Sequence, residues 1–176
     1  GPYNPPQGLR FNKNKYLVDP YAKAFSKGSV FKSYNLQHKK GFSVKEPGLL
    51  KDLSGFPKCV VVDDSLDWEG DRPLKFPLEK TIIYETHLKG FTASSSAKVS
   101  FPGTYKGFIE KIPYLKDLGI TAVELLPIFE FDENENGNIN PKSGERLKNY
   151  WGYSTIGFFA PKQGYSSDKT PGGCVR

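Results

Sequence analysis

The chain has 176 residues, of which 37% are hydrophobic, and it carries a formal net charge of +6. This length fits one ordinary domain or parts of two, and the apolar content favours a folded core over wholesale disorder. No apolar run approaches the roughly 18 residues of a membrane-spanning helix, and the lysines are scattered rather than gathered in one stripe, so neither a membrane nor a nucleic acid is an expected partner.

Residues 1–75 are rich in Gly, Pro, Asn, Asp and Lys, and their strand-like runs are few and short. The pair Asp19-Pro20 is a turn signal, and residues 21–25 after it are predicted to form one helical turn. Residues 59–62 are a β-branched run between Gly-Phe-Pro and Asp-Asp, which is the pattern of a short strand. We expect the tail of one domain and a long ordered connector here, rather than a complete core.

Residues 81–127 predict a strand, a helix and a second strand. Residues 81–85 and 120–127 are continuous apolar runs typical of buried strands. Between them, apolar side chains recur at helical spacing, at Phe108, Ile109, Ile112, Leu115 and Leu118. Pro113 predicts that this helix is kinked or starts late. Gly119 predicts that the helix ends there, with the glycine in the left-handed backbone conformation.

Such a βαβ unit implies parallel strands and a right-handed crossover. The pattern leaves two architectures open, a doubly wound sheet and a (β/α)8 barrel. The first strand-to-helix connection has no G-x-G-x-x-G motif, so a dinucleotide-binding fold loses support.

Residues 128–152 are loop-like and leave the carboxyl end of the second strand, where parallel folds build their sites. The densest aromatic cluster follows in residues 149–161. Aromatic faces stack on sugar rings, and their polar edges bond hydroxyl groups. The alternative interpretation is an ordinary aromatic core beneath a loop.

An acidic stretch at residues 130–137 matches only the first half of a calcium-binding loop. Ser143 stands at the twelfth position, where a bidentate Glu is required, so we expect a solvated polar loop. His87 directly follows the first strand and either lines a site or serves as a hydrogen-bonded structural residue. Neither a nucleophile triad, a metal cluster, a P-loop nor a catalytic carboxylate pair can be assembled from spacing.

The cysteines indicate the redox compartment, and the chain ends indicate whether the chain is part of a longer protein. Cys59 and Cys174 have no metal-ligand spacing, and two thiols fit a reducing compartment, although a single disulfide stays open. The chain starts at Gly1 without an initiating Met or a signal peptide, and it stops at Arg176 without a terminating element. Both ends are expected of a piece cut from something longer.

Motifs along nearly the whole chain match a known family in order. They lie at residues 8–12, 17–24, 62–71, 83–92, 102–107, 115–127, 149–153 and 157–161. The most specific are Asn-Tyr-Trp-Gly-Tyr at 149–153 and Gly-Phe-Phe-Ala-Pro at 157–161. By these motifs the chain resembles the glycogen-debranching and isoamylase branch of the α-amylase family of glycoside hydrolases.

The resemblance implies an α/β fold, the N-terminal part of a (β/α)8 TIM barrel preceded by the tail of a β-sandwich domain and a connector. It assigns residues 1–75 to the end of a carbohydrate-binding-like sandwich and the connector. Residues 76–176 would hold the first strands and helix of the catalytic barrel, which is truncated.

The resemblance also implies a glycoside hydrolase parent that cleaves α-1,6 branch linkages in glycogen, amylopectin or limit dextrins. The reaction retains configuration, with an Asp attacking the sugar and a Glu protonating the leaving oxygen. Both carboxylates are expected beyond Arg176, so no catalytic residue is assigned here and the isolated piece is expected to be inactive. An enzyme acting on α-1,4 linkages, a branching enzyme and a non-catalytic glucan-binding fragment remain open alternatives.

Three substrate-binding residues follow from the resemblance. Tyr153 matches the tyrosine that stacks on glucose at the cleavage subsite, and Trp151 and Asn149 belong to the same wall. Some members bind calcium near the loop that matches residues 130–133, but Phe131 and Glu133 replace the expected ligand types, so neither a metal nor another cofactor is predicted. The implied partner is an α-glucan, and the implied location is the cytoplasm, with a plastid as the alternative.

Overall fold

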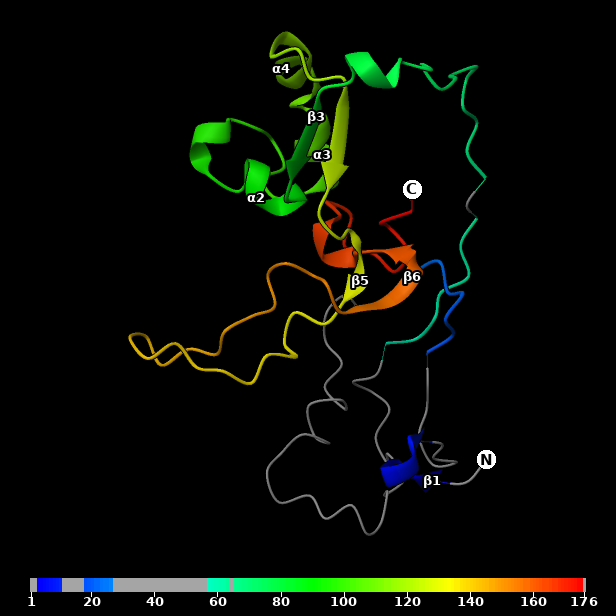
Figure 1. Ribbon diagram of the computed structural model, residues 1–176, viewed down its shortest axis with the longest axis vertical. Coiled ribbons are helices and arrows are strands. Elements are labelled where there is room, and N and C mark those ends of the chain that lie inside the picture. The colour runs from blue at the N-terminus through cyan, green and yellow to red at the C-terminus, as the bar shows by residue number, and fades with distance from the viewer. Residues whose placement is uncertain (1–2, 11–17, 27–56, 64, 176) are drawn as a thin grey trace.

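The structure is a computed structural model that describes residues 3–10, 18–26, 57–63 and 65–175 (Figure 1). Part of the predicted first half, including motif residues 11, 12 and 17, lies outside the described residues. At the start, β1 (Tyr3–Asn4) and β2 (Leu9–Arg10) pair antiparallel across the short 3-10 turn η1 (Pro5–Gln7). The division at residue 75 and the assignment of this pair to a sandwich stay predictions.

The two strands of the predicted βαβ unit are parallel, which confirms that part of the sequence interpretation. β3 (Ile83–Thr86) lies beside β4 (Ala122–Leu125), with Ile83 opposite Ala122 and Thr86 opposite Leu125. The N–H of Leu126 donates to the carbonyl of Thr86 at 3.0 Å and extends the pairing. Both strands therefore end at one edge, where the chain continues from Thr86 into His87.

Short helices make the crossover, in place of the one helix predicted. They are α2 (Leu88–Thr92), η3 (Ser95–Ala97), α3 (Tyr105–Ile109) and α4 (Ile112–Asp117), while the 3-10 turn η2 (Leu78–Lys80) precedes β3. Pro113 lies in the first turn of α4, which confirms the predicted late start, because proline fits there without losing a helical hydrogen bond. Gly119 follows α4 with a φ of +85°, as predicted.

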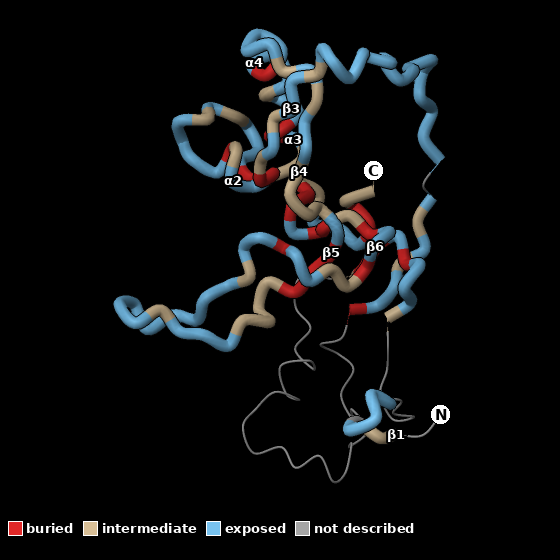
Figure 2. Tube along the Cα trace, viewed as in Figure 1, coloured by how far each residue is buried: buried red, intermediate tan, exposed pale blue. Residues whose placement is uncertain are grey.

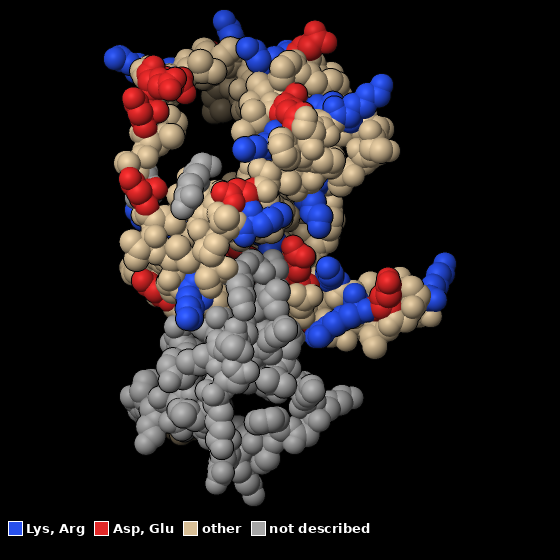
Figure 3. All heavy atoms as spheres, turned by 180° about the vertical axis from the view of Figure 1, so that it is seen from behind, with Lys and Arg blue, Asp and Glu red and all other residues tan. Residues whose placement is uncertain are grey.

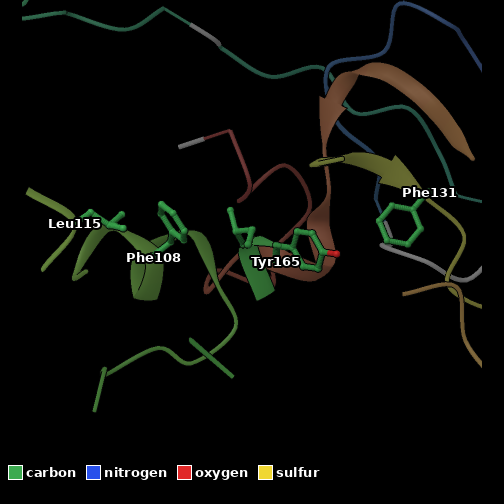
Figure 4. Close-up of a cluster of buried hydrophobic side chains, with 5 residues drawn as sticks. Phe108, Leu115, Phe131 and Tyr165 are labelled. Atoms are coloured by element: carbon green, nitrogen blue, oxygen red, sulfur yellow. The ribbon is translucent and has the colours of Figure 1, made fainter. Parts of the chain in front are cut away.

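One buried cluster joins the crossover helices to the later part of the chain (Figure 4). It contains Leu88, Phe108, Leu115, Phe131 and Tyr165. Figure 2 shows that buried segments concentrate around the helices next to β3 and around β5 and β6, while the connector before β3 is exposed. The core therefore ties the parallel pair to the segment beyond its carboxyl edge.

The predicted burial of the two strands is wrong for the residues that the structure describes. Ile83 of β3 is 56% exposed and Val123 of β4 is 39% exposed. On the helices, Ile109, Ile112 and Leu118 are exposed as well. The reason is that the described part of the chain pairs β3 only with β4, so neither side of this two-stranded sheet is fully covered.

The stretch predicted as a loop contains a strand, and the aromatic cluster contains another. β5 (Phe129–Phe131) pairs antiparallel with β6 (Thr155–Pro161), and η4 (Gln163–Tyr165) follows. The register shifts on both sides of Glu130, so the pair is irregular. Residues 132–154 join the two strands, and part of this connection projects from the body as an arm closed by a bridge between Ile139 and Arg146 (Figure 1).

The turn predicted at Asp19-Pro20 is confirmed, since the N–H of Ala22 donates to the carbonyl of Asp19 at 3.1 Å. The helical turn predicted at residues 21–25 is wrong. Phe25 instead forms an antiparallel bridge with Cys59. The backbone groups on either side of Phe25 bond to residues 58 and 60 of a distant segment, and not to the next helical turn.

The strand predicted at residues 59–62 is reduced to that single bridge, and Val61 is fully exposed. Ala22, Phe25 and Ala160 form a small second cluster, which places this segment against β6. Cys59 and Cys174 are both free thiols. Among the described residues, no helix has the length and apolarity to cross a membrane.

Candidate functional site

The site predicted around residues 149–153 lies beyond the carboxyl edge of the parallel pair. β3 runs directly into His87, β4 runs within a few residues into β5, and residues 149–153 return to His87 from the far end of the projecting arm. The loop of residues 149–153 therefore lies at the edge where both strands end. The sequence predicted this position, because parallel folds build their sites at the carboxyl ends of their strands.

His87 connects strand β3 to the loop. Its Nδ1 accepts the N–H of Gly90 at 2.9 Å and so caps α2. In the neutral ring the proton then lies on Nε2, which donates to the carbonyl of Tyr150 at 2.9 Å. The imidazole also stacks on the Tyr150 ring, with centroids 4.1 Å apart and planes 11° apart. Of the two interpretations of His87, the hydrogen-bonded structural one is confirmed.

Asn149 holds the loop from within. Its Nδ2 donates to Glu135 Oε1 at 2.6 Å and to Ser154 Oγ at 2.9 Å, while its Oδ1 accepts the N–H of Gly152 at 3.0 Å. The Ser154 hydroxyl makes a further bond to the same Glu135 oxygen. The side-chain amide is therefore engaged inside the protein, where it orders its neighbours, and a place for Asn149 in a glucan-binding wall stays a prediction.

Gly152 fits where no other residue would. It is buried, has a φ of +81°, and a Cβ built on it would lie 2.6 Å from Cε1 of Phe131. The Phe131 ring is itself 1% exposed, so it has little room to move away. Glycine at this position lets the chain turn sharply over the buried ring.

Trp151 and Tyr153 face outward on either side of this turn. Tyr153 is 71% exposed and Trp151 is 56% exposed. The Trp151 indole packs edge-on against Tyr150, with centroids 5.6 Å apart, and against His87. The two open aromatic rings sit on a backbone that His87, Asn149 and Gly152 fix, which is a favourable arrangement for stacking on a ligand.

A small recess opens next to the loop. Its lining includes Lys89, Glu133, Lys148, Asn149 and Tyr150. The rings of Phe131 and Tyr165 complete the lining, and charged, amide and phenolic groups beside aromatic rings suit a polyhydroxylated ligand. Figure 3 shows one face of the molecule, on which the acidic and basic side chains of the described residues are interspersed.

The expectation of a solvated acidic loop is wrong at its beginning. Glu130 is fully buried and Asp132 is 1% exposed. Glu130 Oε1 lies 3.2 Å from Nζ of Lys162, and its Oε2 accepts the N–H of Gln163 at 2.7 Å. The sequence pattern could not reveal this burial, because the partner Lys162 is distant along the chain.

Asp132 is held differently from Glu130. Its Oδ1 accepts the N–H of Asn134 at 2.9 Å, while its Oδ2 is buried and has no hydrogen-bond partner in the part of the chain that the structure describes. Burial raises the pKa of this carboxyl above its ordinary value. Within the described residues, no group of three or more His, Cys, Asp or Glu side chains is placed to hold a metal ion.

Comparison with known proteins shows what this chain is similar to. Residues 69–154 match the family model of the α-amylase catalytic domain. Over 172 residues the chain is 41% identical to the chloroplastic isoamylase 1 of Arabidopsis thaliana, covering 95% of this chain and 20% of that protein. Over 173 residues it is 38% identical to the glycogen debranching enzyme of Yersinia enterocolitica, covering 96% of this chain and 24% of that protein.

Solved structures of pullulanases have a similar fold. The type I pullulanase of Bacillus subtilis, complexed with maltose, is similar with a TM-score of 0.55 and 27% identity, over 88% of this chain and 19% of that one. The Group B Streptococcus pullulanase SAP is similar with a TM-score of 0.60 and 25% identity, over 90% of this chain and 20% of that one.

Over residues 69–154 the chain resembles the α-amylase catalytic domain, and its fold is similar to that of the pullulanases. The resemblance to the isoamylase and glycogen-debranching branch of that family, predicted from the motifs, is confirmed. The chain spans about a fifth of the length of the curated relatives it matches.

Proposed function

We propose that the whole protein is a glycoside hydrolase that cleaves α-1,6 branch linkages in glycogen, amylopectin or limit dextrins. The observation that carries this proposal is the exposed Tyr153 ring on an ordered loop at the carboxyl edge of β3 and β4. The names of the relatives, isoamylase and glycogen debranching enzyme, support the same activity. Pullulanases with a similar fold are described in complex with maltose and with maltotriose.

The residues at this site bind and orient the glucan. The open face of Tyr153 stacks on the apolar face of a glucose ring, and Trp151 extends the wall. Because hydrogen bonds and ring contacts already fix the loop, little conformational entropy is lost when the sugar binds. The Asp nucleophile and the Glu acid that cleave the bond belong to other segments of the whole protein.

The same proposal extends to the architecture. β3 and β4 are the first two strands of a (β/α)8 barrel, residues 1–75 are the end of a β-sandwich domain with its connector, and residues 76–176 belong to the barrel. The exposed apolar residues on β3 and β4 support this, because neighbouring strands and helices of a closed barrel would cover them. Three relatives are chloroplastic by name, which supports a plastid as an alternative to the cytoplasm.

The test uses the whole protein and a Tyr153→Ala variant. We expect wild type to release linear chains from amylopectin with loss of α-1,6 linkages. We expect Tyr153→Ala to lower kcat/KM by at least about tenfold, the effect of about 1.4 kcal/mol of lost transition-state binding. Tyr114→Ala is the matched control, because Tyr114 is a half-exposed tyrosine on α4, at the other end of the strand pair (Figure 1).

Two results would overturn the proposal. One is cleavage of α-1,4 linkages with the branch points intact, which would favour the α-1,4-acting alternative. The other is retention of glucan by the whole protein without any hydrolysis, which would favour a binding protein.

A further inference from the structure

The ammonium group of Lys162, just after β6, lies in the interior of the protein. The Lys162 side chain has no exposed surface. Its Nζ lies 3.2 Å from Oε1 of Glu130, 3.0 Å from the carbonyl oxygen of Phe131 and 3.5 Å from Oε1 of Glu133. It also lies 3.9 Å from the centroid of the Phe131 ring.

A buried ammonium is stable only when oxygen atoms replace its water, and a buried carboxylate is stable only beside a cation. The oxygens around Lys162 come from Glu130, Phe131 and Glu133, at the end of β5 and just beyond it, so the ammonium fixes both side chains and backbone there. Removal of the charge would leave Glu130 buried beside Glu133 without its cation, and that segment would have to move or admit water.

The segment that Lys162 fixes is the one on which the sugar-facing loop rests. The carbonyl of Glu133 accepts the N–H of Asn149 at 2.9 Å. The ring of Phe131, which has the ammonium next to it, is also the surface over which Gly152 turns. Two contacts therefore lead from Lys162 to the loop, one through Glu133 and one through Phe131.

We propose that Lys162 is a positioning residue for the glucan site, an internal cation that holds residues 130–133 in place and through them the loop that presents Tyr153. This inference rests on the proposed glucan-binding function for its effect on activity. Its effect on the order of the loop is independent of that function. Among the described residues, Lys162 reaches the loop through Glu133 and Phe131, and it acts at a distance from the substrate.

The test compares Lys162→Met with wild type in the whole protein, because methionine keeps much of the side-chain length and loses the charge. Hydrogen–deuterium exchange of a peptide that covers residues 149–154 reports on the loop without reference to activity. We expect faster exchange in this peptide and a fall in kcat/KM on limit dextrin of about tenfold to a hundredfold, the cost of displacing a binding group by about 1 Å. The matched control is Lys116→Met, on the exposed surface of α4, which should change neither measurement.

A second variant covers the case in which Lys162→Met does not fold. Glu133→Gln keeps the shape of the side chain and removes one charged partner of the ammonium, and Glu133 is only partly buried. We expect it to speed exchange in the same peptide by a smaller factor. Wild-type exchange at residues 149–154 in both variants, or in Glu133→Gln when only that variant folds, would overturn the role of Lys162. Absence of α-1,6 cleavage by the wild-type protein would instead overturn the proposed function and leave the exchange result standing.

Discussion

Replacement of Gly152 by alanine tests how closely the loop is fitted to the buried ring beneath it. The added Cβ would lie 2.6 Å from Cε1 and 2.9 Å from Cδ1 of Phe131, and Gly152 has a φ of +81°. A non-glycine residue in the left-handed region costs about 1–2 kcal/mol. Overpacking against a buried ring costs about 1–3 kcal/mol more, so the structure predicts a total near 2–5 kcal/mol.

The loop has two ways to respond, and both are measurable. If Phe131 moves, the core around Lys162 is disturbed and the midpoint of thermal unfolding falls. If the loop lifts instead, Tyr153 moves with it, and a displacement of about 1 Å can lower kcat/KM by about a hundredfold. We therefore expect Gly152→Ala to lower kcat/KM on limit dextrin by at least about tenfold in the whole protein.

The control for this substitution lies in the same connection between β5 and β6. A Cβ on Gly137 would meet no atom within 4 Å, so Gly137→Ala should behave as wild type. If Gly152→Ala kept both kcat/KM and the unfolding midpoint of wild type, the loop would not depend on its contact with Phe131, and the reasoning would be refuted.

Two further substitutions test His87 and Asp132. His87→Ala should lower kcat/KM, and it should lower the free energy of unfolding by about 1 kcal/mol because α2 loses its cap. His87→Asn should keep the cap and still lose activity, because the bond to Tyr150 is gone. Equal activity in the Asn variant and the wild type would contradict this. Burial raises the pKa of Asp132 in the folded state above the ordinary 3.8. Ionisation of this carboxyl therefore destabilises the fold as the pH rises from 3.8 through the raised pKa. Asp132→Asn should therefore unfold at the same or a higher temperature than wild type at pH 7, with any advantage shrinking as the pH falls towards about 4; a clearly lower midpoint at pH 7 would contradict it.

Local patterns in the sequence predicted the elements whose causes are local. Pro113 and Gly119 marked where α4 begins and ends, because the proline ring and the left-handed glycine act through their own backbone. The runs around Ile83 and Val123 predicted two parallel strands correctly. Their burial could not be predicted in the same way, since it depends on which segments cover the sheet.

Features that depend on distant partners were missed. β6 was not predicted because Phe158 and Phe159 are adjacent and both exposed, which breaks the alternation expected of a strand, and its pairing with β5 is irregular. The burial of Glu130 depends on Lys162, which approaches it only after the chain has passed through the arm and β6.

The aromatic cluster shows why its two interpretations could not be separated from the sequence. Tyr150 stacks on His87 as part of the folded framework, while Tyr153, three residues later, turns its ring to the outside. Tyr150 therefore belongs to the framework of the loop, and the stacking of a sugar on Tyr153 stays a prediction. The direction of each ring depends on the turn at Gly152 and on the bonds of Asn149, which composition and spacing do not reveal.

A crystal structure of the whole protein bound to a short malto-oligosaccharide would show directly whether Tyr153 stacks on a glucose ring. We expect a glucose ring stacked on the open face of Tyr153 at van der Waals distance, about 4 Å, with residues 149–153 in the conformation described here. A sugar bound elsewhere while the Tyr153 ring lies covered by another segment of the protein would contradict the claim.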